Sequence, residues 1–280
     1  MSILQVNKYS MALSRFITFH VILPDDAPPA MLEGNQNYER KPKTLYLLHG
    51  FSGNTTDWLY GSSIQALSLK YNLAVVLPSG ENSFYLNGKG VGRAYETFTG
   101  VELPEYISKT FGLSGRAEDN FIGGLSMGGF GAIHTALKYP ERFGRMFGLS
   151  SAMLQNDIAG MKPGEKNDIA DYDYYYQVFG DLDHLDMSEN NPEYLIRMKK
   201  EKGEEIQPIF MACGTEDFIV KNNREFRDFL ISQGIEPVYY ESPGIHDWTF
   251  WNQYLEPAIR WGLGLGEGKE QAIPGVILPE

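Results

Sequence analysis

The sequence contains one G-x-S-x-G motif, Gly124-Leu125-Ser126-Met127-Gly128. An apolar run typical of a buried strand precedes it, and a helical pattern follows from Met127 to Tyr139. Between a strand and a helix, such a serine occupies a sharp turn that exposes its hydroxyl, and the glycines let the two elements approach closely. We therefore predict that Ser126 attacks an acyl carbon, although the motif by itself fits an ordinary structural turn equally well.

A serine hydroxyl needs a base to remove its proton, and that base is usually histidine. The chain has five histidines, and the order serine, acid, histidine that accompanies this motif leaves His184 and His246. His184 lies in a polar stretch, whereas His246 follows the last predicted strand. We predict His246 as the base, the alternative being a histidine that caps the final helix.

The acid of the triad should follow the strand that lies between these two residues in the sequence. Glu216 and Asp217 both stand there, after Cys213. We favour Asp217, whose carboxylate would accept the Nδ1 proton of His246. Glu216 stays a competitor, and Asp217 could instead be only the N-cap of the next helix.

An acyl transfer also needs two backbone donors for the negative charge on the carbonyl oxygen. Met127 opens a helix, where the N-terminal field favours an anion. The second donor should come from the loop His49-Gly50-Phe51-Ser52-Gly53 after an early strand, and Phe51 is our candidate. That loop taken alone fits an ordinary glycine turn as well.

Short apolar runs separated by amphipathic stretches predict the elements that position these residues. The predicted strands are residues 15–23, 45–48, 73–77, 121–125, 146–149, 209–213 and 238–240. Alternating strands and helices predict the α/β class, with a mostly parallel central sheet, helices on both faces and ligands at the carboxyl ends of the strands.

One domain over residues 1–262 accounts for this alternation. Residues 151–195 interrupt the alternation with an aromatic and acidic stretch, which we predict to be a small cap insertion. A surface loop without a capping role fits the sequence equally well. Residues 24–43 indicate a surface loop, and residues 263–280, rich in glycine, a flexible tail.

The composition constrains partners and compartment. A net charge of −12 and no basic run argue against nucleic acid or an anionic membrane surface as a partner. The single cysteine, Cys213, excludes an internal disulfide and reads as a buried strand thiol. The start of the chain lacks the pattern of a secretory signal and no stretch could span a bilayer, so we expect a cytoplasmic protein. A homo-oligomer is compatible with the sequence.

These motifs together resemble the esterase D family, whose members have the α/β-hydrolase fold and include tributyrin esterases, S-formylglutathione hydrolases, feruloyl and acetylxylan esterases and mycolyltransferases. The resemblance runs from Arg15 to Trp261. It is carried by Leu48-His49-Gly50-Phe51-Ser52-Gly53 with Asp57-Trp58, Gly124 to Ala132, Cys213-Gly214-Thr215-Glu216-Asp217, and Gly244-Ile245-His246-Asp247-Trp248 with Trp251. It implies Asp217 rather than Glu216 as the acid, and hydrolysis of short acyl esters with neither metal nor organic cofactor.

The closest likeness within the family is to tributyrin esterases, whose nucleophile segment reads S-M-G-G-F-G, as here. S-formylglutathione hydrolases usually carry histidine where this chain has Phe130, and cysteine near Ser52 or Gly53. We therefore expect a serine carboxylesterase. The alternatives are a carbohydrate esterase for acetyl or feruloyl groups, an S-formylglutathione hydrolase, and a catalytically silent binding protein.

The substrate is expected to be a small-molecule or sugar-linked acyl ester. Three aromatic residues near the motifs are candidates for lining its pocket: Trp58, Tyr85 and Trp248. Core packing is the competing role for such side chains.

Overall fold

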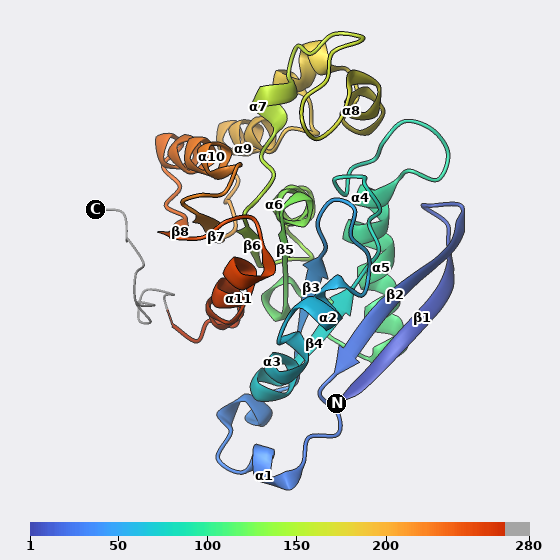
Figure 1. Ribbon diagram of the computed structural model, residues 1–280. Helices are drawn as coiled ribbons and strands as arrows, with labels where there is room; N and C mark the ends of the chain where they lie inside the picture. Colours follow the sequence, from blue (N-terminus) through green and yellow to red (C-terminus); the bar gives the residue numbers. More distant parts are fainter. Residues whose placement is uncertain (267–280) are drawn as a thin grey trace.

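The computed structural model describes residues 1–266 and is built around one sheet of eight strands (Figure 1). The strands are β1 (Ser2–Ser10), β2 (Arg15–Leu23), β3 (Lys43–Leu48), β4 (Leu73–Leu77), β5 (Asn120–Leu125), β6 (Arg145–Leu149), β7 (Ile209–Gly214) and β8 (Val238–Ser242). Their order in the sheet is β1-β2-β4-β3-β5-β6-β7-β8.

The direction of the strands determines where the loops gather. β1 pairs antiparallel with β2, and β2 with β4. All pairs from β4 through β3, β5, β6 and β7 to β8 are parallel. The predicted mostly parallel sheet is therefore confirmed. The loops after β3, β5, β7 and β8 meet at one edge, which is where ligands bind in such sheets.

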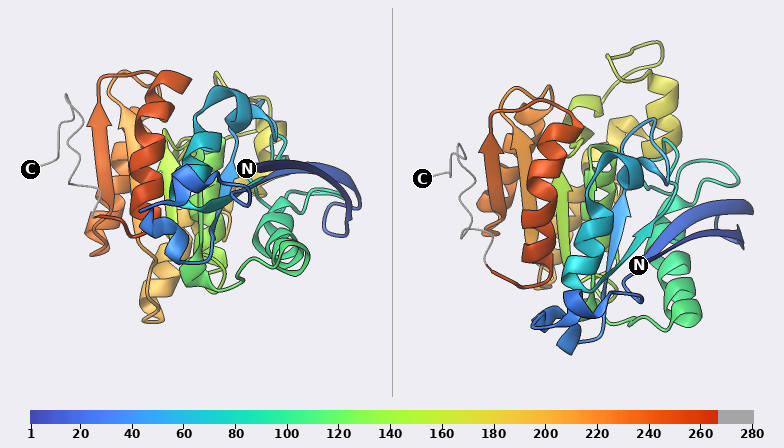
Figure 2. Two further views of the ribbon diagram at one scale, coloured as in Figure 1. Left: turned by 90° about the horizontal axis from the view of Figure 1, so that it is seen from below. Right: turned by 60° about the horizontal axis from the view of Figure 1, so that its bottom comes forward.

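Helices cover both faces of this sheet (Figure 2). They are α1 (Pro29–Leu32), α2 (Asp57–Gly61), α3 (Ile64–Tyr71), α4 (Tyr95–Thr97), α5 (Leu103–Phe111), α6 (Met127–Lys138), α7 (Gln155–Ile158), α8 (Tyr172–Phe179), α9 (Pro192–Glu201), α10 (Val220–Ser232) and α11 (Trp248–Gly262). Short segments of other helix types add to them: the 3-10 helices η1 (Gln36–Glu39), η3 (Ala117–Asp119) and the kinked η4 (Leu182–Met187), and the π-helical η2 (Phe98–Glu102). No helix within residues 1–266 has the length and apolar character needed to cross a bilayer.

Two hydrophobic cores lie on opposite faces of the sheet because successive side chains of a strand point to opposite faces. In β3, Tyr46 and Leu48 belong to the core under α5 and α6. Leu45 and Leu47 belong to the core under α3 and α11. Strands that are buried on both faces explain the continuous apolar runs in the sequence.

The structure differs from the sequence prediction in two segments near the start of the chain. β1 was not predicted, because its side chains alternate between half-buried and exposed and it forms the edge of the sheet. The predicted loop 24–43 contains the short helix α1 and the turn η1. From residue 267 onward, the predicted tail 263–280 lies outside the described residues.

The predicted insertion contains α7, α8 and η4, which stand above α6 in the view of Figure 1. The last helix of the connection, α9, begins at Pro192 and packs against α6. The excursion from the regular alternation therefore ends near residue 191, and α9 is an ordinary crossover helix that leads into β7.

The first turn of α6 crosses β3 at very short range. A Cβ atom built on Gly128 would lie 2.4 Å from the carbonyl oxygen of Leu48 and 2.6 Å from that of His49. These are backbone atoms at the end of a central strand and of the residue after it, so they cannot move aside as a flexible side chain would. Only glycine permits this crossing.

We expect Gly128→Ala to lower the free energy of unfolding by about 1–3 kcal/mol, the usual cost of forcing extra volume into a packed core. Gly115→Ala is the matched control, because its new Cβ would have the Ser108 hydroxyl at an ordinary 3.5 Å as its nearest neighbour. Urea unfolding followed by circular dichroism measures both. Equal stability of the two variants would contradict the crossing as described.

Candidate active site

Ser126 occupies the turn between β5 and α6 in a backbone conformation that non-glycine residues rarely adopt, with φ 53° and ψ −120°. Its amide N–H donates to the carbonyl of Leu149 at 2.9 Å, and its own carbonyl accepts from the N–H groups of Gly129 and Ala152. The neighbouring strand end and the helix start thus hold the strained residue in place. The residue is largely buried, with 9% of its surface exposed.

Asp217 and His246 form a hydrogen-bonded pair at the same edge of the sheet. His246 Nδ1 lies 2.9 Å from Asp217 Oδ2 and 3.1 Å from Oδ1. The carboxylate is buried and also accepts from the N–H of Ile219 at 3.1 Å. Burial alone would raise the pKa of Asp217, but the hydrogen bond and charge of His246 outweigh it and hold the pKa below its ordinary value. Asp217 is therefore ionised when His246 needs a negative partner.

The imidazole of His246 is fixed by rings as well as by the carboxylate. Trp251 lies edge-on to it, with ring centroids 5.1 Å apart and an interplanar angle of 88°. Phe218 is tilted against it, with ring centroids 4.7 Å apart. Within residues 1–266 the hydrogen bonds of His246 go to Asp217. A hydrogen bond from the Ser126 hydroxyl to Nε2 of His246 is therefore a proposal of the mechanism and not a contact in this structure.

Glu216, the competing acid, faces another partner. Its side chain is exposed, and Oε2 accepts from the N–H of Gly244 at 2.6 Å. That hydrogen bond lowers the pKa of Glu216 and connects the loop after β7 to the loop carrying His246. The geometry favours Asp217 as the partner of the histidine and gives Glu216 a role in holding the loop.

The two proposed oxyanion donors lie on adjacent loops of the same sheet edge. Met127 is the first residue of α6, so its N–H has no partner within the helix. Among the described residues, no acceptor binds the N–H of Phe51. Both amides are therefore free to bind a carbonyl oxygen.

Buried His49 braces the loop that carries Phe51. Its Nε2 accepts from the N–H of Gly80 at 2.8 Å, so Nδ1 carries the proton and donates to the carbonyl of Gly50 at 2.7 Å. Burial lowers the pKa of His49, which keeps the ring neutral and this arrangement intact. The only sequence feature that argued against His49 as the catalytic base was its position before Ser126, because the base follows the serine in this motif order.

The structure corrects the predicted pocket lining. Trp58 is 1% exposed and donates its indole N–H to the carbonyl of Leu48 at 2.9 Å, and Tyr85 is fully buried with its hydroxyl on the carbonyl of His49. Both side chains belong to the core and brace the β3 end. Trp248 is half-buried and packs edge-on against Trp58, so of the three it alone retains exposed surface.

A residue missed by the sequence analysis, Tyr174 of α8, brings the insertion to the site. Its hydroxyl donates to the carbonyl of Asn82 at 2.7 Å, and its ring lies edge-on to Phe51 with centroids 5.6 Å apart. The aromatic run 172–176 gave a signal, but its helical phase was needed to tell that Tyr174 faces Phe51 while Tyr175 enters the core.

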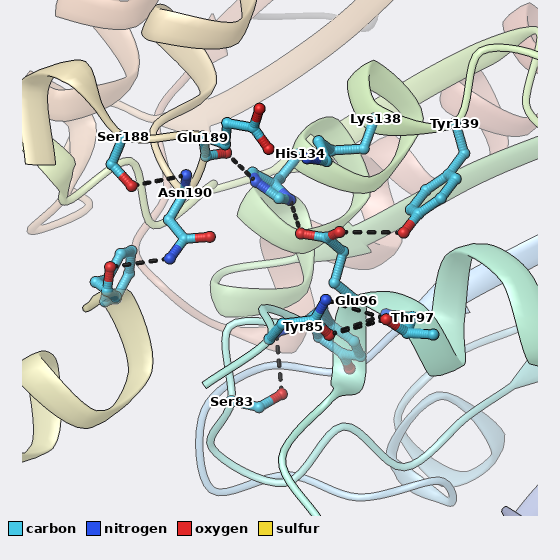
Figure 3. Close-up of polar contacts among 12 residues, drawn as sticks. Ser83, Tyr85, Glu96, Thr97, His134, Lys138, Tyr139, Ser188, Glu189 and Asn190 are labelled. Carbon is cyan, nitrogen blue, oxygen red and sulfur yellow. Dashed lines mark hydrogen bonds and ion pairs between the residues drawn. The ribbon is translucent and has the colours of Figure 1, made fainter. Parts of the chain in front are cut away.

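His134 lies apart from this chemistry and attaches the insertion to α6 (Figure 3). It is fully buried, its Nε2 bonds the carbonyl of Glu189 at 2.8 Å, and its Nδ1 lies 4.0 Å from Glu96. Lys138, one turn later, pairs with the Glu189 carboxylate. Burial lowers the pKa of His134, so the neutral ring serves here as a structural connector.

Comparison with known proteins identifies the family of this chain. The sequence profile of the Esterase family matches residues 10–261. The chain belongs to this family. As a member of the esterase D branch of the α/β hydrolases it is a serine esterase. The chain is 45% identical to an acetyl esterase of Caldicellulosiruptor saccharolyticus over 262 residues, which cover 93% of this chain and 98% of the relative.

Solved structures of esterase-family proteins superpose over almost the whole chain. One is the fluorophosphonate-binding serine hydrolase FphF of Staphylococcus aureus, with a TM-score of 0.79, 30% identity, and 94% of this chain and 98% of that chain covered. Another is the S-formylglutathione hydrolase FrmB of Staphylococcus aureus, with a TM-score of 0.77, 29% identity and the same coverage. The expected α/β-hydrolase fold is thereby confirmed.

We expect Asp217→Asn to lower kcat for an acetyl ester by about four orders of magnitude, because an amide cannot hold the required tautomer or stabilise the imidazolium. Glu216→Gln is the matched control on the neighbouring residue. Its amide oxygen can still accept from Gly244, so we expect less than a tenfold change. The reverse ranking of the two variants in steady-state assays would make Glu216 the acid.

Proposed function

We propose that this serine esterase hydrolyses acetyl and similarly short acyl esters through Ser126, His246 and Asp217. The observation that carries the proposal is the hydrogen bond between buried Asp217 and His246 at the sheet edge where Ser126 occupies its strained turn. A 45% identical relative named an acetyl esterase supports acetyl as the acyl group.

In the proposed mechanism the Ser126 hydroxyl attacks the ester carbonyl while its proton passes to Nε2 of His246. The N–H groups of Met127 and Phe51 stabilise the negative oxygen of the tetrahedral intermediate. When this collapses, the bond to the alcohol breaks and His246 returns the proton to the departing oxygen. Water then attacks the acyl-enzyme with the same histidine as base, which releases the acid and restores Ser126.

The charges around the histidine support this sequence of proton transfers. Each time His246 takes a proton, a positive ring forms next to the buried carboxylate of Asp217, where low polarisability strengthens their attraction. Asp217 is already ionised, so no proton has to leave the pair first. Trp251 and Phe218 limit rotation of the ring between the two half-reactions.

The position of the insertion supports a short acyl group. Tyr174 reaches across from α8 and closes over Phe51, the proposed oxyanion residue. We infer that this contact beside the proposed oxyanion loop leaves little room for a long acyl chain. Several solved structures named ferulic acid or feruloyl esterases are less than 25% identical to this chain, so they support the fold and leave the bulkier feruloyl group unsupported.

The second candidate function is hydrolysis of S-formylglutathione, because a 29% identical solved structure carries that name. Phe130 argues against it. Its ring is fully buried between Phe84 and Phe179, where that group of enzymes usually has histidine. Cysteine is absent near Ser52 and Gly53.

Initial rates on p-nitrophenyl esters from acetate to decanoate test the proposal. We expect the highest kcat/KM on acetate, a steep fall beyond butyrate, and loss of turnover in Ser126→Ala, because the nucleophile forms the acyl-enzyme. Ser232→Ala, at an exposed serine of α10, is the control and should retain full activity. A fluorophosphonate probe should label the wild type and Ser232→Ala, and not Ser126→Ala.

Three results would contradict the proposal. Full turnover in Ser126→Ala would exclude the assigned nucleophile. Higher kcat/KM on decanoate than on acetate would exclude a small acyl pocket. Turnover of S-formylglutathione well above that of any acetate would favour the second candidate.

A further inference from the structure

Two exposed apolar side chains stand directly beside the catalytic pair in the sequence. Phe218 follows Asp217 and is 66% exposed, and Ile245 precedes His246 and is 55% exposed. Single exposed hydrophobic residues are common on protein surfaces. These two are notable for their location, because each sits on a loop that also positions a residue of the proposed triad.

Phe218 belongs to a rigid turn. The N–H of Asp217 donates to the carbonyl of Gly214, and the N–H groups of Ile219 and Val220 donate back to Asp217. The same hydrogen bonds that hold the carboxylate therefore hold the backbone of Phe218. Its ring lies 4.7 Å from the imidazole of His246, centroid to centroid, at an interplanar angle of 54°.

The direction of the reaction determines which part of an ester meets this ring. In the proposed mechanism the carbonyl oxygen faces Phe51 and Met127, and the alcohol oxygen must face His246 to receive its proton. Any substituent on that oxygen larger than a methyl group then extends along the histidine. An exposed ring that touches the histidine is therefore within reach of the alcohol portion of the substrate.

We propose that Phe218 forms a binding site for the alcohol portion of the ester, and that the site takes an alcohol built on a ring. The inference rests on the proposed function and adds to it the chemistry of the leaving group. The face of an aromatic side chain carries negative charge and attracts C–H edges, whether of a sugar ring or of an aryl group.

The test compares three acetates that differ only in the alcohol: ethyl acetate, phenyl acetate and methyl 2-O-acetyl-β-D-xylopyranoside. All three give the same acetyl-enzyme, so differences in kcat/KM arise before the alcohol leaves. The quantity to measure is the kcat/KM of each ring-bearing acetate divided by that of ethyl acetate. This ratio cancels any effect of a substitution that is common to the esters compared. Weaker protonation by His246 would slow ethyl acetate most and so raise the ratio, which is opposite to the change expected from loss of a binding contact.

We expect Phe218→Ala to lower that ratio about three- to tenfold for at least one ring-bearing acetate, the range typical of aromatic contacts. Phe218→Leu, which keeps apolar volume without the ring, should lower it similarly, and Phe218→Tyr should preserve it. Phe16→Ala is the matched control, because Phe16 is 76% exposed on β2. A fall for the xyloside alone identifies sugar alcohols as the ligand, and a fall for phenyl acetate alone identifies aryl alcohols.

Unchanged ratios in both Phe218→Ala and Phe218→Leu would overturn the inference. Equal loss on all three acetates would overturn it too, because Phe218 would then act only by positioning His246. A wild-type protein with no turnover of any acetate would refute the proposed function first, before any variant is made, and the inference would fall with it.

Discussion

The strained backbone of Ser126 is the constraint on which the rest of the site depends. A φ of 53° with a ψ of −120° is costly for a residue with a side chain. This conformation persists because the chain must pass directly from β5 into α6, while the first turn of α6 packs against β3 at the short distance that Gly128 permits. Two hydrogen bonds to the end of the neighbouring strand β6 and the residues after it then hold this conformation. The N–H of Ser126 donates to Leu149, and the N–H of Ala152 donates to Ser126. The fold as a whole, rather than any local propensity, presents the hydroxyl at the sheet edge.

The charges that act on the site are also positioned by this edge of the sheet. The start of α6 places a partial positive charge beside Ser126, where the negative oxygen is expected to form. The buried carboxylate of Asp217 places a negative charge on the far side of His246. A net charge of −12 does not oppose this arrangement, because exposed charges more than about 10 Å away are screened by salt while buried partners are not. Local geometry therefore governs the pKa of Asp217.

Sequence reasoning succeeded where burial leaves a pattern. Strands covered on both faces read as apolar runs, so β3 to β8 were predicted to within a few residues. β1 escaped because an edge strand with one half-buried face alternates weakly. Adjacent Glu216 and Asp217 could not be separated by spacing, since only the turn after β7 decides which carboxylate points inward. Trp58 and Tyr85 were misassigned because the sequence near a motif does not show the role of an aromatic residue. The same residue type lines a pocket in one protein and packs beneath the strand in another.

The insertion joins two parts of the site that the sheet holds separately. At one end Glu189 binds His134 and Lys138 on α6, two to three turns beyond Ser126 (Figure 3). At the other end Tyr174 binds Asn82 and contacts Phe51. Asn82 in turn accepts from the N–H of Ser52, next to Phe51. A shift of the insertion would thus act on the helix that carries the nucleophile and on the loop that carries the second oxyanion donor. The insertion, which we propose to bound the acyl side, is therefore connected to both elements that carry the proposed oxyanion donors. For that reason acyl preference and turnover should change together when the insertion is altered.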